Sequence, residues 1–154
     1  MYLSRNFSLS ELTKSQTALR NGLDNKPSME EIVALTVLCN NILQPVRDRY
    51  GSFTPNSAFR TVELCKLVGS SAKSQHAKGE AADIEVAGID NYELAEWIAK
   101  NLDFDQLILE FYNSDDPSSG WVHVSHSRIK GEQRHDIRHT VVQDKKVKYK
   151  QGLA

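Results

Sequence analysis

The chain has 154 residues, of which 40% are hydrophobic and 25% are charged, as in ordinary soluble globular proteins. This length suits one hydrophobic core, so we expect a single domain over residues 1–154. The formal net charge of −1 gives no electrostatic reason to expect nucleic acid or an anionic membrane as a partner. No apolar run approaches the roughly 18 residues of a membrane span.

The first third of the chain predicts helices. A short surface helix should end near Asn21. Ser28 and Glu31 then form a capping box at the start of a longer helix, which ends near Tyr50 and has Pro45 as a site for a kink. Apolar residues recur along this helix at helical spacing and form a stripe that we expect to cover a sheet: Ile32, Leu35, Leu38, Cys39, Ile42, Leu43 and Val46.

A second helix is expected at about 61–67, and the small and polar residues from 69 to 74 then predict an exposed loop where a substrate cleft would open. Cys39 and Cys65 both fall in apolar helical patterns. We expect them to be buried free thiols rather than a disulfide.

Three segments predict strands, namely residues 81–86, 106–111 and 121–125. In each segment the alternate positions on one side are apolar and should pack on a core, whereas the other side carries polar and functional side chains. A polar loop at 113–120 joins the second and third strands, which makes them antiparallel neighbours. A helix is expected at 91–101, between the first two strands.

The tail, residues 127–154, is basic and loosely patterned. Residues 140–142 and 146–149 are expected to pair as an edge hairpin or to belong to a disordered end.

Two imidazoles and a carboxylate form the candidate metal site: His76, Asp83 and His123. This is a ligand set that Zn²⁺ takes at catalytic sites, with the fourth position left for water. A lone histidine and aspartate at such spacing are usually polar residues held by hydrogen bonds, but the second histidine in an otherwise apolar strand favours a metal. His126 lies at odd offset from His123 and should face the other way, and His135 and His139 are expected at the surface.

The segment Ser74-Gln75-His76-x-x-Gly79-x-Ala81-x-Asp83, followed by Trp121-x-His123, resembles the zinc D-Ala-D-Ala carboxypeptidase and endopeptidase family, peptidase family M15, in its small phage and bacterial members. The resemblance implies a zinc peptidase that acts on peptidoglycan stem peptides, with His76, Asp83 and His123 as the metal ligands. It also implies that Arg60, upstream of the first ligand, holds the substrate.

This chain departs from the family at Gly120, because many members carry an acidic catalytic residue three positions before the last histidine ligand. Glu110 on the neighbouring strand is the expected substitute as the general base, since a metallopeptidase needs a group that takes a proton from the attacking water. The alternatives are Glu85 and the loop residues Asp115 and Asp116.

A guanidinium suits the terminal carboxylate that a carboxypeptidase must bind, which makes Arg60 the first candidate for substrate binding. Ser74, Gln106 and Trp121 are further candidates, although an aromatic residue beside a metal is as often simple packing.

The predicted fold is therefore α+β: a small antiparallel sheet with helices packed on one face and the zinc site on the other, as in the hedgehog and DD-peptidase fold. The expected reaction is zinc-dependent hydrolysis of a peptide bond in peptidoglycan, by a monomer. A non-catalytic zinc-containing module for cell-wall binding or virion structure is the alternative. The N-terminal segment lacks the apolar core of a signal peptide, so the expected route to the wall is lysis or a virion, with a phage as one source.

Overall fold

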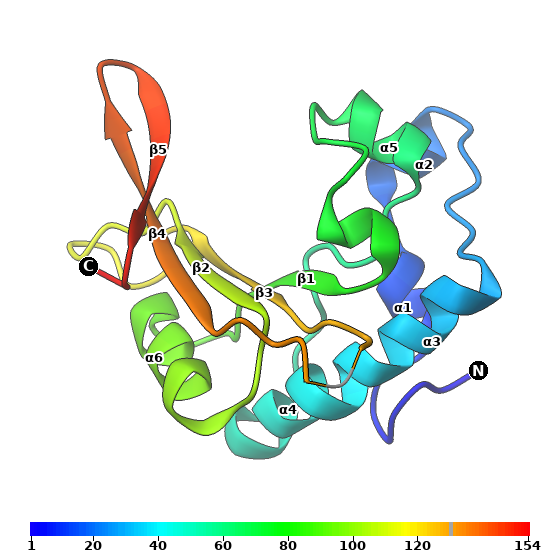
Figure 1. The fold of residues 1–154 in the computed structure, drawn as a ribbon, viewed down its shortest axis with the longest axis horizontal. Coiled ribbons are helices and arrows are strands. Elements are labelled where there is room, and N and C mark those ends of the chain that lie inside the picture. The colour runs from blue at the N-terminus through cyan, green and yellow to red at the C-terminus, as the bar shows by residue number, and fades with distance from the viewer. Residues whose placement is uncertain (130) are drawn as a thin grey trace.

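The computed structural model describes residues 1–129 and 131–154 as an α+β fold built on one five-stranded sheet, with the strand order β1-β3-β2-β4-β5. The main helices lie below this sheet in Figure 1, whereas the β4–β5 hairpin and α5 rise above it at its two ends. The strands are β1 (Ala81–Ile84), β2 (Gln106–Glu110), β3 (Trp121–Ser125), β4 (Asp136–Gln143) and β5 (Lys146–Gln151). The predicted fold class is confirmed.

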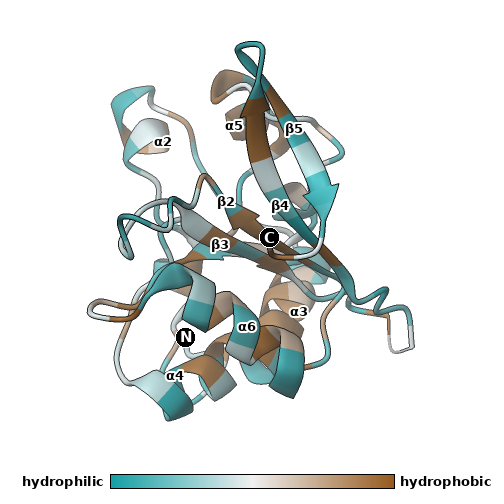
Figure 2. Ribbon diagram, turned by 90° about the vertical axis from the view of Figure 1, so that its left-hand side faces the viewer, coloured by the Kyte–Doolittle hydropathy of each residue, from teal (hydrophilic) through white to brown (hydrophobic). Residues whose placement is uncertain are grey.

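The register confirms the predicted parity of β1, β2 and β3. β3 pairs antiparallel with both β1 and β2, and His123 lies opposite Asp83 on one side and Ile108 on the other. The residues that alternate with these belong to the core: Ala82, Ile84, Leu107, Leu109, Val122 and Val124. In Figure 2 the middle of the sheet is accordingly brown.

The longest helical segment runs without interruption through α3 (Met29–Leu38), a π-helical turn η1 (Cys39–Leu43) and α4 (Gln44–Tyr50). It begins at the predicted capping box of Ser28 and Glu31. The π turn ends at Leu43, two residues before Pro45, which lacks the backbone N–H that an α-helix would use there. The expected disturbance at Pro45 therefore takes the form of a π turn. Together with α6 (Asn91–Asn101), this segment contributes most of the helical side chains in the core.

The remaining helices are short. The single helix expected before Asn21 is two, α1 (Leu9–Thr13) and α2 (Gln16–Arg20). Ser15 caps the second one through its side chain, which explains the break. The others are α5 (Val62–Leu67) and a 3₁₀ turn, η2 (Gln75–Lys78). No helix in the described part of the chain is long and apolar enough to cross a bilayer.

The tail forms the edge hairpin that was one of the two expectations, but it does more than pair with itself. β4 also pairs with β2, and this pairing is parallel, from Gln106 opposite Asp136 to Leu109 opposite His139. The sheet is thus mostly antiparallel, with one parallel pair. The hairpin extends well past the end of β2 in Figure 1.

Cys39 and Cys65 are buried and free, as predicted. Burial raises the pKa of the Cys39 thiol to about 12, which keeps it in the neutral form.

Candidate active site

The structure brings His76, Asp83 and His123 together. Each offers one ligand atom, and the three atoms lie within 4.8 Å of one another. Within residues 1–129 and 131–154, this is the one group of three histidine, cysteine or acidic side chains close enough to share a metal ion. The three side chains come from η2, β1 and β3, as the alternation of the strands predicts.

His76 is held by its backbone neighbours. The hydroxyl of Ser74 accepts a hydrogen bond from the His76 backbone N–H, and Gly79 ends the turn with a φ of +73°. A Cβ at Gly79 would lie 2.6 Å from the carbonyl oxygen of Glu31, so only glycine allows η2 to approach α3 this closely. His76 Nδ1 donates to the carbonyl of Ala58 at 2.6 Å, which leaves Nε2 free as a ligand.

Asp83 lies between the two imidazoles. Its Oδ1 atom is 3.1 Å from His123 Nδ1 and 3.4 Å from His76 Nε2. Burial alone would raise the pKa of the Asp83 carboxyl, but hydrogen bonds with His123 and His76 outweigh burial and hold that pKa far below its usual range. Asp83 is therefore an anion at neutral pH, as a metal ligand must be.

Arg60 lies beside the group of His76, Asp83 and His123 and contacts Asp83. Its Nη2 donates to the second carboxylate oxygen of Asp83 at 3.4 Å, and its Nε donates to the hydroxyl of Ser57 at 2.9 Å. Its backbone N–H donates to the carbonyl of His76 at 3.2 Å. The segment that precedes α5 thus orients Asp83 and His76, and it presents the Arg60 guanidinium to the pocket.

Glu110 lies on the same face of the sheet as His123, because it is two residues beyond Ile108 on β2. Only 7% of its surface is exposed. Burial raises the pKa of its carboxyl to about 7, an effect that nearby His123 opposes and Asp83 reinforces. A carboxyl that titrates near neutral pH suits a general base.

This raised pKa predicts a pH-dependent stability of the metal-free protein. The protonated carboxyl is favoured in the folded state, so the contribution of Glu110 is fully present below its ordinary pKa of 4.5 and is lost as the pH rises through about 7. Metal-free Glu110→Gln should therefore be more stable than the metal-free wild type at pH 8, by roughly 1–3 kcal/mol. The difference should shrink towards pH 5 in urea unfolding; a difference that does not change with pH would contradict the burial argument.

The structure gives a physical reason for glycine at position 120. Gly120 has a φ of +67°, and a Cβ there would lie 1.9 Å from the carbonyl oxygen of Glu110. Phe111, directly after Glu110, also has a positive φ of 52°. The return from β2 to β3 is thus too tight for any side chain at Gly120, and this backbone excludes an acidic residue there.

Gly120→Ala should destabilise the protein by roughly 2–4 kcal/mol, because the new methyl group collides with backbone atoms that no rotamer change can move. Gly88 is the matched control, since its φ is +80° but a Cβ there meets nothing within 4 Å. Gly88→Ala carries only the backbone strain and should cost about 1 kcal/mol. Equal losses for the two variants in urea unfolding would show that the contact at Gly120 is relieved elsewhere.

An open pocket of about 1670 Å³ lies over this face of the sheet. It is lined by all the site residues that the sequence predicted: Arg60, Ser74, His76, Asp83, Gln106, Glu110, Trp121 and His123. Most residues of the loop before η2 line it too, as expected of a cleft there: Gly69, Ser70, Ser71, Lys73 and Ser74.

The alternative bases do not line the pocket. Glu85 accepts hydrogen bonds from Asn56 and Asn91, and Asp115 and Asp116 are exposed in the loop between β2 and β3. The geometry therefore favours Glu110.

The three remaining polar or aromatic candidates have neighbours of their own. Ser74 caps η2, and Gln106 donates through its side chain to Asp136 at 2.9 Å. The centroid of the Trp121 ring lies 5.4 Å from that of the Phe111 ring, and both residues line the pocket.

The other histidines lie outside the metal group. His126 is buried just after the end of β3, and its Nδ1 donates to the carbonyl of Ser127 at 2.8 Å. His135 is exposed, as predicted, and contacts Asp103. His139 is half-buried rather than at the surface, because it donates to the carbonyl of Gly152 from within β4.

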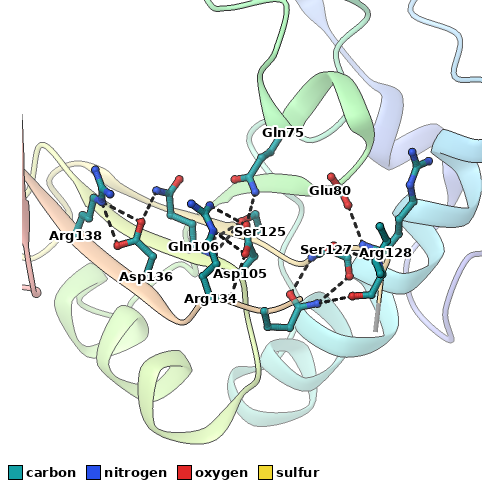
Figure 3. Close-up of polar contacts among 12 residues, drawn as sticks. Gln75, Glu80, Asp105, Gln106, Ser125, Ser127, Arg128, Arg134, Asp136 and Arg138 are labelled. Carbon is teal, nitrogen blue, oxygen red and sulfur yellow. Dashed lines mark hydrogen bonds and ion pairs between the residues drawn. The ribbon is translucent and has the colours of Figure 1, made fainter. Parts of the chain in front are cut away.

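Sequence reasoning missed the part of the pocket that the tail forms. Arg134, Arg138 and Tyr149 all line it. Figure 3 shows Arg138 and Gln106 on either side of Asp136, and Arg134 beside Asp105 and Gln75. The parallel pairing of β4 with β2 brings them there, and the weak alternation of the tail gives no signal for that partner.

No curated protein sequence matches the chain. The family described as Peptidase M15 matches residues 5–125, a span that runs from before α1 to the end of β3 and includes the three ligand candidates and Glu110. The match over most of the chain leads to one conclusion: this protein belongs to the peptidase M15 family.

Proposed function

We propose that this protein is a zinc-dependent peptidase that hydrolyses a peptide bond in peptidoglycan stem peptides, as a D-alanine-type carboxypeptidase or an endopeptidase. The observation that carries the proposal is the placement of the buried carboxyl of Glu110 in the same pocket as His76, Asp83 and His123.

The donor set fits zinc. Two imidazole nitrogens and one ionised carboxylate are what Zn²⁺ takes at catalytic sites, and the Ala58 carbonyl fixes the tautomer of His76 that a ligand requires. When bound, Zn²⁺ lowers the pKa of water to about 7 and polarises a carbonyl group.

Glu110 is the proposed general base. It accepts a proton from the water that attacks the scissile carbonyl and passes it to the leaving amine, for which a pKa near 7 is well matched. Its burial in the wall of the pocket also limits competition from bulk water for that proton.

Arg60 is the proposed anchor for a substrate carboxylate. One of its terminal nitrogens already contacts Asp83, so a carboxylate bound by the rest of the guanidinium would lie beside the metal group. Ser74, Gln106 and Trp121 line the same pocket and are proposed to contact the peptide.

The alternative, a non-catalytic zinc module, would be favoured by a closed site with four protein ligands. In the described part of the chain the group has three members and opens into a large pocket. This arrangement supports the enzyme.

Digestion of purified peptidoglycan, followed by mass spectrometry of the fragments, tests the proposal. Release of free D-alanine means a carboxypeptidase, and loss of cross-linked species with new stem fragments means an endopeptidase. Peptidoglycan that stays unchanged with zinc-loaded protein would contradict the proposed substrate.

A further inference from the structure

One wall of the pocket comes from residues beyond the family match. The match ends at residue 125, whereas the hairpin of β4 and β5 adds Arg138 and Tyr149 to the lining. Because β4 pairs with β2 along Gln106 to Leu109, this wall is fixed to the strand that carries Glu110. The hairpin therefore belongs to the pocket structurally, through Arg138 and Tyr149.

Arg138 lies on the same cross-strand row as the metal group. Asp83 is opposite His123, His123 is opposite Ile108, and Ile108 is opposite Arg138. Neighbouring strands are about 4.8 Å apart, so the Cα atoms of His123 and Arg138 are separated by about 10 Å. A peptide that crosses the strands at the metal group would pass Arg138.

The Arg138 side chain is oriented but not saturated. Its Nε donates to both carboxylate oxygens of Asp136, at 3.1 and 3.0 Å, and Gln106 holds the same carboxylate from the other side at 2.9 Å. In residues 1–129 and 131–154, the terminal nitrogens of Arg138 make no hydrogen bond, and 37% of the side chain is exposed. A guanidinium held through Nε keeps its two terminal nitrogens for a second carboxylate.

Arg134, its neighbour in the pocket, is used differently. Its Nε and Nη2 both donate to Asp105, each at 2.9 Å, and Asp105 also accepts from Gln75 at 2.7 Å. Asp105 is buried, so this pair ties the segment before β4 to the loop before β2 and to η2. Arg134 thus binds its structural partner through Nε and one terminal nitrogen, whereas Arg138 binds Asp136 through Nε alone.

We propose that Arg138 is a specificity-determining residue that binds a carboxylate of the substrate, on the side of the metal group opposite to Arg60. The proposal rests on the function proposed above and adds a substrate class to it: peptides with an acidic group near the bond that is cut. An extended peptide rises about 3.3 Å per residue, so the 10 Å separation places that carboxylate within about three residues of the scissile bond.

The test uses two synthetic peptides, built around the bond that mass spectrometry identifies, which differ only in a free carboxylate or its amide at the nearest acidic position. The zinc-loaded wild type should prefer the acid by about tenfold or more in kcat/KM, as expected for a charged hydrogen bond. Arg138→Gln should bring this ratio close to one, and Arg138→Lys, a point charge without the fork, should give an intermediate ratio. Arg134→Gln, the matched control, should keep the wild-type ratio even if it lowers stability. An unchanged ratio in Arg138→Gln, or an equal loss in Arg134→Gln, would overturn the assignment.

A binding measurement separates this inference from the proposed function. The arginine Nε–H signals of the ¹⁵N-labelled, zinc-loaded protein are followed by NMR while an N-acetylated tripeptide amide with a central glutamate, or its glutamine counterpart, is added. Movement of the Arg138 signal with the glutamate peptide alone supports the subsite, even if peptidoglycan is not cut. If the two peptides move it equally, or neither does at millimolar concentration, the subsite is wrong, whatever the enzyme hydrolyses.

Discussion

Glu110→Gln should lower kcat on a confirmed peptide substrate by roughly 10²-fold or more. The amide keeps the size and much of the hydrogen bonding of the carboxylate, but it cannot take up a proton from the attacking water. Because Glu110 is not a member of the His76, Asp83 and His123 group, the variant should retain its zinc. Steady-state kinetics and metal analysis on the same preparation measure both quantities.

Asp115→Asn is the matched control for this experiment. Asp115 is an exposed carboxylate in the loop between β2 and β3 and does not line the pocket, so its amide should leave turnover close to wild type. Near-wild-type turnover in Glu110→Gln would show that Glu110 is not the base. A large loss in Asp115→Asn would point to the loop instead.

His76→Ala, Asp83→Ala and His123→Ala should each lose most of the bound zinc and, with it, nearly all activity. Removal of one of three protein ligands leaves too few donors for tight binding, and Asp83 contacts both histidines. Metal analysis by mass spectrometry after dialysis gives the zinc content of each variant.

His126→Gln provides the comparison, because His126 is a nearby buried histidine outside the group of three. It should keep about one zinc ion per chain. Retention of zinc in all three ligand variants would place the metal elsewhere, and loss of zinc in His126→Gln alone would identify a different ligand.

The central part of the site could be predicted from the sequence because it follows from local rules. Alternation along a strand puts Asp83 and His123 on the face opposite to Ile84 and Val122, and the polar loop makes β2 and β3 neighbours. These two rules alone place Glu110 on the face of the metal group.

The rest depends on contacts that leave little trace in a single sequence. The Ala58 carbonyl that orients His76 is a backbone atom, and any residue at that position would supply it. The parallel pairing of β4 with β2 joins segments far apart in the chain, and the local pattern around Arg138 does not indicate this partner. The sequence therefore predicts only an edge hairpin or a loose tail there. At Gly120 the sequence shows the departure from the family, but only the 1.9 Å approach of the Glu110 carbonyl oxygen to a Cβ explains it.

Reconstitution with zinc tests the central claim most directly. Protein treated with a chelator should not release fragments from peptidoglycan, and added zinc should restore the activity until it saturates at about one zinc ion per chain. His123→Ala, given the same zinc, should stay inactive. Chelated protein that is free of zinc and still cuts peptidoglycan at the full rate would contradict the account.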